Sequence, residues 1–230
     1  MKVQWLHDFI SVFYPEVCLG CTQPLVNQEK LICLNCLAEL PKTNFHKQYN
    51  NPIFHLFTAR IPFQKATAYL YFQKKGIVQS LIHNLKYNNF PEVGVRLGRM
   101  AGTDLIADDF PKGIDVILPV PLHPTKQSKR GYNQSESVAN GLATIMGIPV
   151  ITDKLVRVTR SSSQTRKSRF ARWLNVEHVF EVNQPEDLTD RHVLLVDDVV
   201  TTGSTLEAAA SRLLEIPALK ISLFTLAYAP

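Results

Sequence analysis

The pattern of apolar positions along the chain changes at about residue 65. Beyond it, runs that are almost continuously apolar indicate buried strands, over residues 65–72, 114–122, 176–182, 191–200 and 219–229. Amphipathic segments between these runs predict helices, over residues 78–87, 93–107, 133–147 and 205–216. Strands of this kind that alternate with helices are typical of a mostly parallel sheet with helices on both faces. The expected fold class is therefore α/β.

The N-terminal part of the chain is organised differently. Residues 42–64 contain three Asn and two Pro and follow neither the helical nor the strand period, which indicates a linker that packs on the larger unit. Closer to the N-terminus, four apolar side chains share one face of a helix expected over residues 3–13, and we interpret this face as a packing surface.

Composition and charge narrow the class of protein. A chain of 230 residues with 45% hydrophobic and 20% charged positions is globular, and is not disordered, collagen-like or a coiled coil. A formal charge of +5 favours anionic partners but does not distinguish DNA from a phosphorylated metabolite. The apolar runs are shorter than the ~20 residues that a membrane span needs, so we expect no membrane insertion. Asp8 interrupts the apolar N-terminal stretch, so we expect no signal peptide and a cytoplasmic location.

All the cysteines lie near the N-terminus, in the spacing C-x2-C-x11-C-x2-C: Cys18, Cys21, Cys33 and Cys36. Two such hooks can supply four thiolates to one Zn²⁺, with no open position left for chemistry. Two disulfides or four unrelated thiols are the alternatives, although disulfides are disfavoured in the cytoplasm. We therefore predict a zinc-binding module over residues 1–45, a linker over 46–64 and an α/β domain over 65–230.

The segment that carries most chemical information is HVLLVDDVVTTGSTLEAAA, residues 192–210. A buried strand places Asp197 and Asp198 at its carboxyl end, where open α/β sheets bind ligands. The following TTGST sequence provides four hydroxyls, one Gly and free backbone N–H groups at a helix N-terminus, which suits a terminal phosphate. Helix capping alone is the alternative, but capping needs only one hydroxyl and leaves the two carboxylates unexplained. Walker A and G-x-G-x-x-G motifs are absent from the chain.

This segment resembles the phosphoribosyl pyrophosphate (PRPP) binding motif of type I phosphoribosyltransferases. Together with the cysteine pairs, the stretch PVPLHPTKQSKRGYNQSE at residues 119–136 and the Arg-rich stretch at 154–172, the whole chain resembles the ComF family, which includes ComFC and GntX proteins. The resemblance implies a type I phosphoribosyltransferase fold with a small N-terminal four-cysteine module, structural Zn²⁺, and Mg²⁺ bound together with PRPP.

The resemblance also implies a role for individual residues. Asp197 and Asp198 would be the catalytic residues, contacting the ribose hydroxyls directly or through Mg²⁺. The loop that would hold the 5′-phosphate consists of Thr201, Thr202, Gly203, Ser204 and Thr205. The cations that would bind pyrophosphate are Lys126, Lys129, Arg130, Arg157 and Arg169, the last two within a mobile basic loop that also includes Thr159 and Gln164. For that loop, nucleic-acid contact and a merely solvated face are the alternatives.

Two functions follow as expectations. The first is Mg²⁺-dependent transfer of a phosphoribosyl group from PRPP to an unknown acceptor, linked to DNA uptake during natural competence. The alternative is a non-catalytic adaptor of the transformation machinery that binds PRPP or single-stranded DNA. Because a sensor could function without a closing basic loop, that loop favours turnover. The partners expected are PRPP, and single-stranded DNA or competence proteins.

Overall fold

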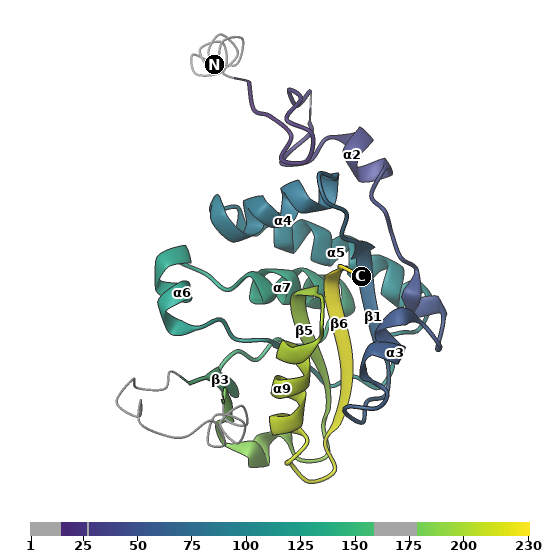
Figure 1. Ribbon diagram of the computed structural model, residues 1–230, viewed down its shortest axis with the longest axis vertical. Coiled ribbons are helices and arrows are strands. Elements are labelled where there is room, and N and C mark those ends of the chain that lie inside the picture. Colours follow the sequence, from purple (N-terminus) through teal and green to yellow (C-terminus); the bar gives the residue numbers. More distant parts are fainter. Residues whose placement is uncertain (1–14, 27, 159–178) are drawn as a thin grey trace.

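A four-stranded parallel sheet forms the centre of the molecule (Figure 1). The computed structural model describes residues 15–26, 28–158 and 179–230. The strand order is β1-β6-β5-β2, and the strands span Ala66–Tyr71 (β1), Val116–Pro119 (β2), His192–Val200 (β5) and Lys220–Tyr228 (β6). All three strand pairs are parallel, so the predicted α/β class with a mostly parallel sheet is confirmed.

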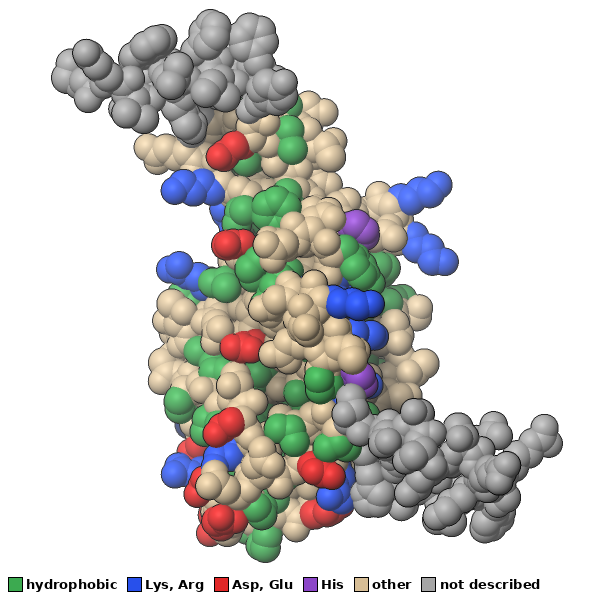
Figure 2. Space-filling model, turned by 90° about the vertical axis from the view of Figure 1, so that its left-hand side faces the viewer, with side chains coloured by type: hydrophobic (Ala, Val, Ile, Leu, Met, Phe, Trp, Pro, Cys, Tyr) green, Lys and Arg blue, Asp and Glu red, His purple; other side chains and the backbone are tan. Residues whose placement is uncertain are grey.

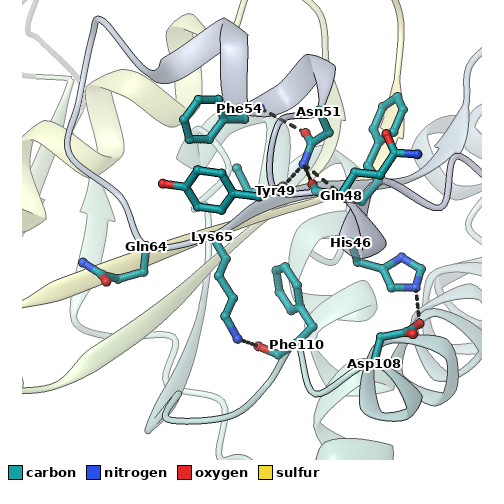
Figure 3. A pocket seen from close by; sticks show the side chains of 11 residues that line it. His46, Gln48, Tyr49, Asn51, Phe54, Gln64, Lys65, Asp108 and Phe110 are labelled. Carbon is teal, nitrogen blue, oxygen red and sulfur yellow. Dashed lines mark hydrogen bonds and ion pairs between the residues drawn. The ribbon is translucent and has the colours of Figure 1, made fainter.

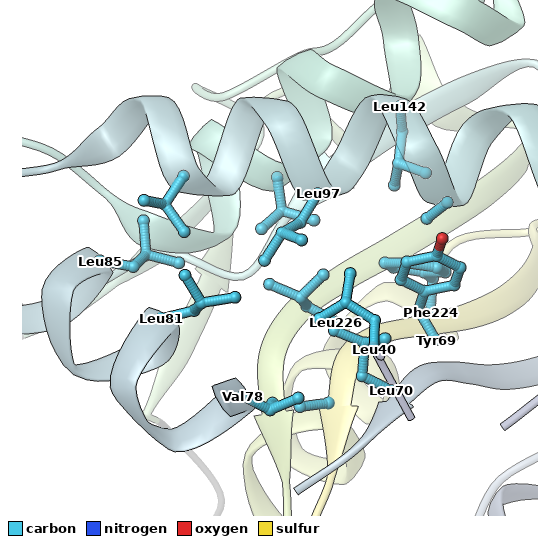
Figure 4. Close-up of a cluster of buried hydrophobic side chains, with 14 of the residues drawn as sticks. Leu40, Tyr69, Leu70, Val78, Leu81, Leu85, Leu97, Leu142, Phe224 and Leu226 are labelled. Atoms are coloured by element: carbon cyan, nitrogen blue, oxygen red, sulfur yellow. The ribbon is translucent and has the colours of Figure 1, made fainter. Parts of the chain in front are cut away.

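Helices cover both faces of this sheet because its strands are apolar on both sides. Leu194 and Val196 of β5 pack into one hydrophobic cluster, and Val193 and Leu195 pack into the other. The first cluster is covered by α4 (Ile77–Tyr87), α5 (Pro91–Ala107) and α7 (Gln134–Met146) (Figure 4). The second is covered by α3 (Pro52–Phe57) and α9 (Ser204–Leu213). Both long helices predicted at 93–107 and 133–147 are confirmed.

Helices α5 and α7 approach each other closely at two glycines. A Cβ atom on Gly98 would lie 2.3 Å from the Val138 carbonyl oxygen, and one on Gly141 would lie 2.2 Å from that of Val95. Any larger residue would therefore push the helices apart. This contact places the N-terminus of α7 beside the carboxyl end of β5, where Ser135 reaches Asp197.

The segment between the main helices and β5 forms a second, separate sheet. β3 (Leu155–Arg157) pairs antiparallel with β4 (Phe180–Val182). The apolar run predicted at 176–182 is thus a short strand outside the central sheet, over the residues that the structure describes. Residues 159–178, which carry most of the basic loop, lie outside the described residues, as does the helix expected over 3–13.

Short helices occur where the sequence showed no period. In the segment expected to be a linker, Asn51 accepts hydrogen bonds from the backbone N–H groups of Ile53 and Phe54 and so starts α3. A 3-10 turn, η1 (Phe45–Lys47), precedes it, and another, η4 (Pro185–Leu188), precedes β5. The cysteine region contains α2 (Leu34–Ala38), and α6 (Pro124–Arg130) follows β2. Among the described residues, no helix is both long and apolar enough to cross a membrane.

Candidate functional site

Two adjacent carboxylates lie close to the carboxyl end of β5, as the sequence predicted. Asp197 and Asp198 are buried, with 8% and 4% of their surface exposed. Asp197 Oδ1 accepts hydrogen bonds from Ser135 Oγ at 3.0 Å and from the Asp198 backbone N–H at 2.9 Å. Asp198 Oδ1 accepts one from the Val199 N–H at 2.7 Å, and its Oδ2 lies 2.8 Å from the Lys86 ammonium. The pair is held by α7 on one side and by α4 on the other.

The environment of Asp197 disfavours its ionised form. Burial is the main cause, followed by the neighbouring charge of Asp198, and together they raise the pKa of Asp197 to about 7. The hydrogen bonds from Asp198 and Ser135 and the charge of Lys86 act in the opposite direction. A carboxyl group with this pKa exchanges a proton near neutral pH, which is typical of functional sites.

The loop after β5 encloses a small polar cavity. Thr201–Thr205, together with Asp197, Val199, Val200 and Leu206, surrounds about 40 Å³. Gly203 is the N-cap residue of α9 and has φ 79°, so no side-chain hydroxyl occupies the N-cap position. Thr202 Oγ1 and Ser204 Oγ lie 3.0 Å apart at the exposed side of the loop. Hydroxyls and a helix N-terminus around a small cavity are suited to a phosphate group.

Residues of the expected linker segment pack against the backbone of this loop. A Cβ atom on Gly203 would lie 2.7 Å from the Phe57 ring, so the backbone of the loop rests directly on α3. Arg60 Nη1 donates a hydrogen bond to the Thr202 carbonyl oxygen at 2.6 Å, and its Nε lies 3.5 Å from Glu207 Oε2 on α9. The sequence did not indicate Arg60, because nothing in an aperiodic segment shows that it contacts a loop over 140 residues further along.

A larger basic cavity lies beside Lys86, and we name it the basic bay. Its volume is about 650 Å³, and it is lined by Lys86, Tyr87, Asn89, Lys126, Ser128, Lys129, Arg130 and Gly131. Three of the cations predicted to bind pyrophosphate thus come together here, and all three lie on α6. The face that carries α6 shows projecting Lys and Arg side chains at mid-height, whereas many of the visible Asp and Glu side chains lie lower (Figure 2).

The sequence RGYNQSE connects the basic bay to the carboxylates. Gly131 ends α6 in a left-handed conformation, and Arg130 donates a hydrogen bond to Gln134. Asn133 caps α7 by accepting a hydrogen bond from the Ser135 N–H at 3.1 Å. This cap presents the Ser135 hydroxyl to Asp197. The segment therefore has both a structural and a site role.

Of the other two predicted cations, only Arg157 lies among the residues that the structure describes. Arg157 lies on β3, where its guanidinium is 5.4 Å from the centre of the Phe180 ring, and it lines neither of the two cavities described above. Arg169 lies outside the described residues, together with Thr159 and Gln164.

A third cavity lies at the start of β1, beside the segment that follows α5 (Figure 3). It encloses about 170 Å³, and its lining includes His46, Tyr49, Lys65, Asp108 and Phe110. His46 Nε2 is 3.0 Å from Asp108 Oδ2, and Lys65 donates a hydrogen bond to the Phe110 carbonyl oxygen at 2.9 Å. These polar groups already have partners within the protein. We therefore interpret this cavity as a packing gap between the linker segment and the domain.

The four cysteines gather into one cluster, with all Sγ atoms within 4.8 Å of one another. Cys21 and Cys33 Sγ are 3.7 Å apart, close to the ~3.8 Å edge of a tetrahedron with Zn–S bonds of ~2.3 Å. Burial opposes ionisation of Cys18, but backbone N–H groups of Cys33, Cys21 and Gly20 donate to its sulfur and lower its pKa to about 7. Burial and the neighbouring thiols raise the pKa of Cys36. Ligand type, number and spacing all fit a structural Zn²⁺.

Comparison with known proteins agrees with this arrangement. The sequence model of the phosphoribosyl transferase domain matches residues 109–230, which include β2, α6, α7, β5 and α9. The chain belongs to this phosphoribosyl transferase domain family. The match excludes α3, α4 and the cysteine cluster.

Named relatives share the sequence in part or almost in full. DNA utilization protein YhgH of Salmonella typhi is 30% identical over 149 residues, 64% of this chain and 65% of that protein. YhgH of Escherichia coli K12 is 26% identical over 91% of this chain and 89% of that protein. Competence protein F of Haemophilus influenzae is 34% identical over 50% of this chain and 51% of that protein. These names confirm the resemblance to the ComF family.

Among solved structures, the glutamine PRPP amidotransferase of B. subtilis is similar, with a TM-score of 0.44 and 18% identity. The similarity covers 62% of this chain and 30% of that one.

Proposed function

We propose that this protein binds PRPP together with Mg²⁺ and transfers the phosphoribosyl group to an acceptor. The observation that carries the proposal is the order of three neighbouring subsites. Asp197 lines the phosphate-sized cavity, Asp198 follows it on β5, and Lys86 connects Asp198 to the basic bay. PRPP has the same order of groups, with a 5′-phosphate, a ribose and a pyrophosphate.

Each subsite would then have one task. The Thr201–Thr205 loop would bind the 5′-phosphate, and Asp197 and Asp198 would accept hydrogen bonds from the ribose hydroxyls. In the reaction, the bond between C1 and the pyrophosphate oxygen breaks and its electron pair leaves with pyrophosphate. A lone pair of the acceptor forms the new bond to C1, and the acceptor proton passes to solvent. Lys126, Lys129 and Arg130 would stabilise the charge on the departing pyrophosphate.

The carboxylates are also the residues that fit Mg²⁺. Asp198 Oδ2 is buried and lies 2.8 Å from the Lys86 ammonium, so it is an anionic oxygen that a metal cation could bind in place of Lys86 or together with it. Carboxylate oxygens are ligands that Mg²⁺ prefers, and the ion would supply charge neutralisation between the ribose and the pyrophosphate. For the cysteine cluster we propose structural Zn²⁺ at Cys18, Cys21, Cys33 and Cys36.

The second candidate is a non-catalytic adaptor in DNA uptake, which binds PRPP or single-stranded DNA. It is supported by the names of the relatives, "DNA utilization" and "competence", and by the concentration of cations at the basic bay. Contacts between these cations and DNA phosphates predict a steep loss of affinity as salt rises. DNA affinity that changed little between low and physiological salt would contradict this candidate.

Calorimetry of PRPP binding with and without Mg²⁺, followed by a pyrophosphate-release assay on the same sample, tests the proposal. Micromolar binding that depends on Mg²⁺, with release stimulated by an acceptor, is the expected result. Binding without release under any acceptor would favour the adaptor. Absence of binding would contradict both the transferase and the PRPP-binding adaptor.

A further inference from the structure

Lys86 belongs to two subsites at once, and the sequence did not indicate it. It lies in the last turn of α4, outside the 109–230 region that matches the family. Its ammonium group is 2.8 Å from Asp198 Oδ2, and the Lys86 side chain also lines the basic bay. The two side chains are 23% and 6% exposed, respectively, so this pair is shielded from solvent far more than an ordinary surface ion pair.

The ammonium group is positioned where a ligand would contact Asp198. Asp198 Oδ1 already accepts the Val199 N–H, so a ligand that contacts this carboxylate would use Oδ2, the oxygen that is paired with Lys86. A ribose hydroxyl or a cation that uses Oδ2 must therefore displace Lys86 or share the oxygen with it. Displacement without compensation is unfavourable, because it separates a buried charge from its partner.

The basic bay is the second place that the Lys86 side chain already borders. Its lining residues include Lys126, Lys129 and Arg130 and no acidic residue. A fourth cation turned fully into this cavity is repelled unless a polyanion is bound there. The long, flexible lysine stem allows the ammonium to change position without a change in the backbone of α4. Whether the Lys86 ammonium is more stable beside Asp198 or in the basic bay therefore depends on what is bound in the basic bay.

We propose that Lys86 is a specificity-determining residue of the donor site, which pairs with Asp198 in the free protein and with pyrophosphate when PRPP is bound. This inference rests on the proposed function of the site. A ligand that carries pyrophosphate compensates the broken Lys86–Asp198 pair by a new one. A sugar phosphate without pyrophosphate, such as ribose 5-phosphate, breaks the pair and receives no compensation. Lys86 thus favours PRPP over ribose 5-phosphate.

The test compares Lys86→Met with Lys126→Met. Both variants remove one cation from the basic bay, but only the first removes the partner of Asp198. Calorimetry with Mg²⁺ measures the affinities for PRPP and for ribose 5-phosphate. We expect PRPP affinity to fall about tenfold in Lys126→Met, the loss of one charged contact, and only about threefold in Lys86→Met, because that variant has no Lys86–Asp198 pair to break. Ribose 5-phosphate affinity should rise about threefold or more in Lys86→Met, which is about 0.7 kcal/mol, and stay unchanged in Lys126→Met.

Binding of Mn²⁺ alone, followed by electron paramagnetic resonance, is the second readout. Mn²⁺ should bind more tightly to Lys86→Met than to the wild type or to Lys126→Met, since Asp198 is then unpaired. If Lys86→Met folds poorly, Lys86→Gln is used: it removes the charge that pairs with Asp198 but its amide can still donate a hydrogen bond, so the same changes are expected in the same direction and to a smaller extent.

The outcomes separate the two proposals. If the wild type binds PRPP but the Lys86 and Lys126 variants behave alike toward ribose 5-phosphate and Mn²⁺, the inference about Lys86 is wrong and the proposed function stands. If the wild type does not bind PRPP, the proposed function fails, and the specificity role of Lys86 fails with it. Tighter Mn²⁺ binding by Lys86→Met would then show only that Lys86 is the counter-ion of Asp198.

Discussion

At the scale of single residues, Asp197 is a carboxyl group in an environment that disfavours its charge. Its pKa is about 7 in the folded protein, against ~3.9 for an unperturbed Asp. Between these values the folded state binds more protons than the unfolded state, so this group makes the free energy of unfolding decrease as pH rises. The decrease is complete once pH exceeds the folded pKa. An ionised Asp197 therefore lowers the free energy of unfolding of the protein.

Replacing Asp197 by Asn is expected to raise the melting temperature, and more at pH 8 than at pH 5, because the penalty grows from the unfolded pKa of ~3.9 and is complete only above the folded pKa of about 7. Each kcal/mol corresponds to about 2–4 °C for a chain of this size. Thermal unfolding followed by circular dichroism across this pH range measures the difference. An equal shift at both pH values would contradict the raised pKa. PRPP binding is expected to weaken in the same variant.

Gly203 is the residue on which the shape of the phosphate-sized cavity depends. We expect Gly203→Ala to destabilise the protein by about 2 kcal/mol or more, from the left-handed backbone together with the contact to Phe57, and to reduce PRPP affinity. Gly147→Ala is the matched control, since Gly147 also has a positive φ of 68° but nothing within 4 Å of an added Cβ. Chemical denaturation should show the smaller loss for Gly147→Ala, with PRPP binding unchanged. Equal losses would mean that Phe57 does not confine the loop.

These residues also show what a sequence can and cannot reveal about a site. Asp197, Asp198 and TTGST are adjacent in the chain, so one linear motif indicates them together. Ser135 reaches Asp197 from 62 positions away, and Arg60 reaches Thr202 from 142 positions away. Such contacts depend on how the elements pack. No local pattern of the sequence records them.

At the scale of elements, length decided which helices could be predicted. α5 and α7 span 17 and 13 residues, enough to show an apolar face over several turns. α3 and α6 have 6 and 7 residues, too few to establish a period, and their starts depend on Asn51 and His123 as caps. Both missed helices contact the proposed donor site. The expected pyrophosphate cations were found by resemblance, whereas their helical arrangement was not.

The contact between the α3 segment and α9 has a measurable consequence. Arg60→Met removes the hydrogen bond to Thr202 and the ion pair with Glu207, so the loop that would bind the 5′-phosphate loses a support. We expect PRPP affinity to fall about fivefold to tenfold, with a stability change below about 1 kcal/mol because these contacts are partly exposed.

Arg96→Met is the matched control for Arg60→Met. Arg96 Nη1 also donates to a backbone carbonyl, that of Lys30, at an exposed position away from the loop. Isothermal titration of both variants with PRPP distinguishes the two contacts. A similar loss of affinity in both would mean that Arg60 does not act through the loop.

At the scale of the whole molecule, the cysteine cluster is continuous with the core of the α/β domain. Cys18, Cys33 and Cys36 are buried in the same hydrophobic cluster as Val78 and Leu81 of α4. Asn84 of α4 also donates a hydrogen bond to the Leu19 carbonyl oxygen at 3.0 Å. The cysteine cluster and α4 of the α/β domain therefore stabilise each other.

Removal of the proposed Zn²⁺ by a chelator is expected to lower the melting temperature of the whole chain by several degrees, at about 2–4 °C per kcal/mol. Metal analysis by mass spectrometry should find one Zn²⁺ per chain in the wild type and a loss of it in Cys36→Ser. Asp197→Asn is the control and should retain its zinc. If the melting temperature does not change when the chelator is added, the cysteines pack without a metal.

The strand order of the sheet has a consequence for the way the chain is made. β1 is the first of the four strands to leave the ribosome, but its partner in the sheet is β6, the last of them. Until residues 220–228 have been synthesised, β1 has no strand to pair with, and β5 lacks one of its two neighbours. A nascent chain therefore cannot complete this sheet until β6 has been made, and the apolar strand β1 stays without its partner while all the residues between the two strands are synthesised.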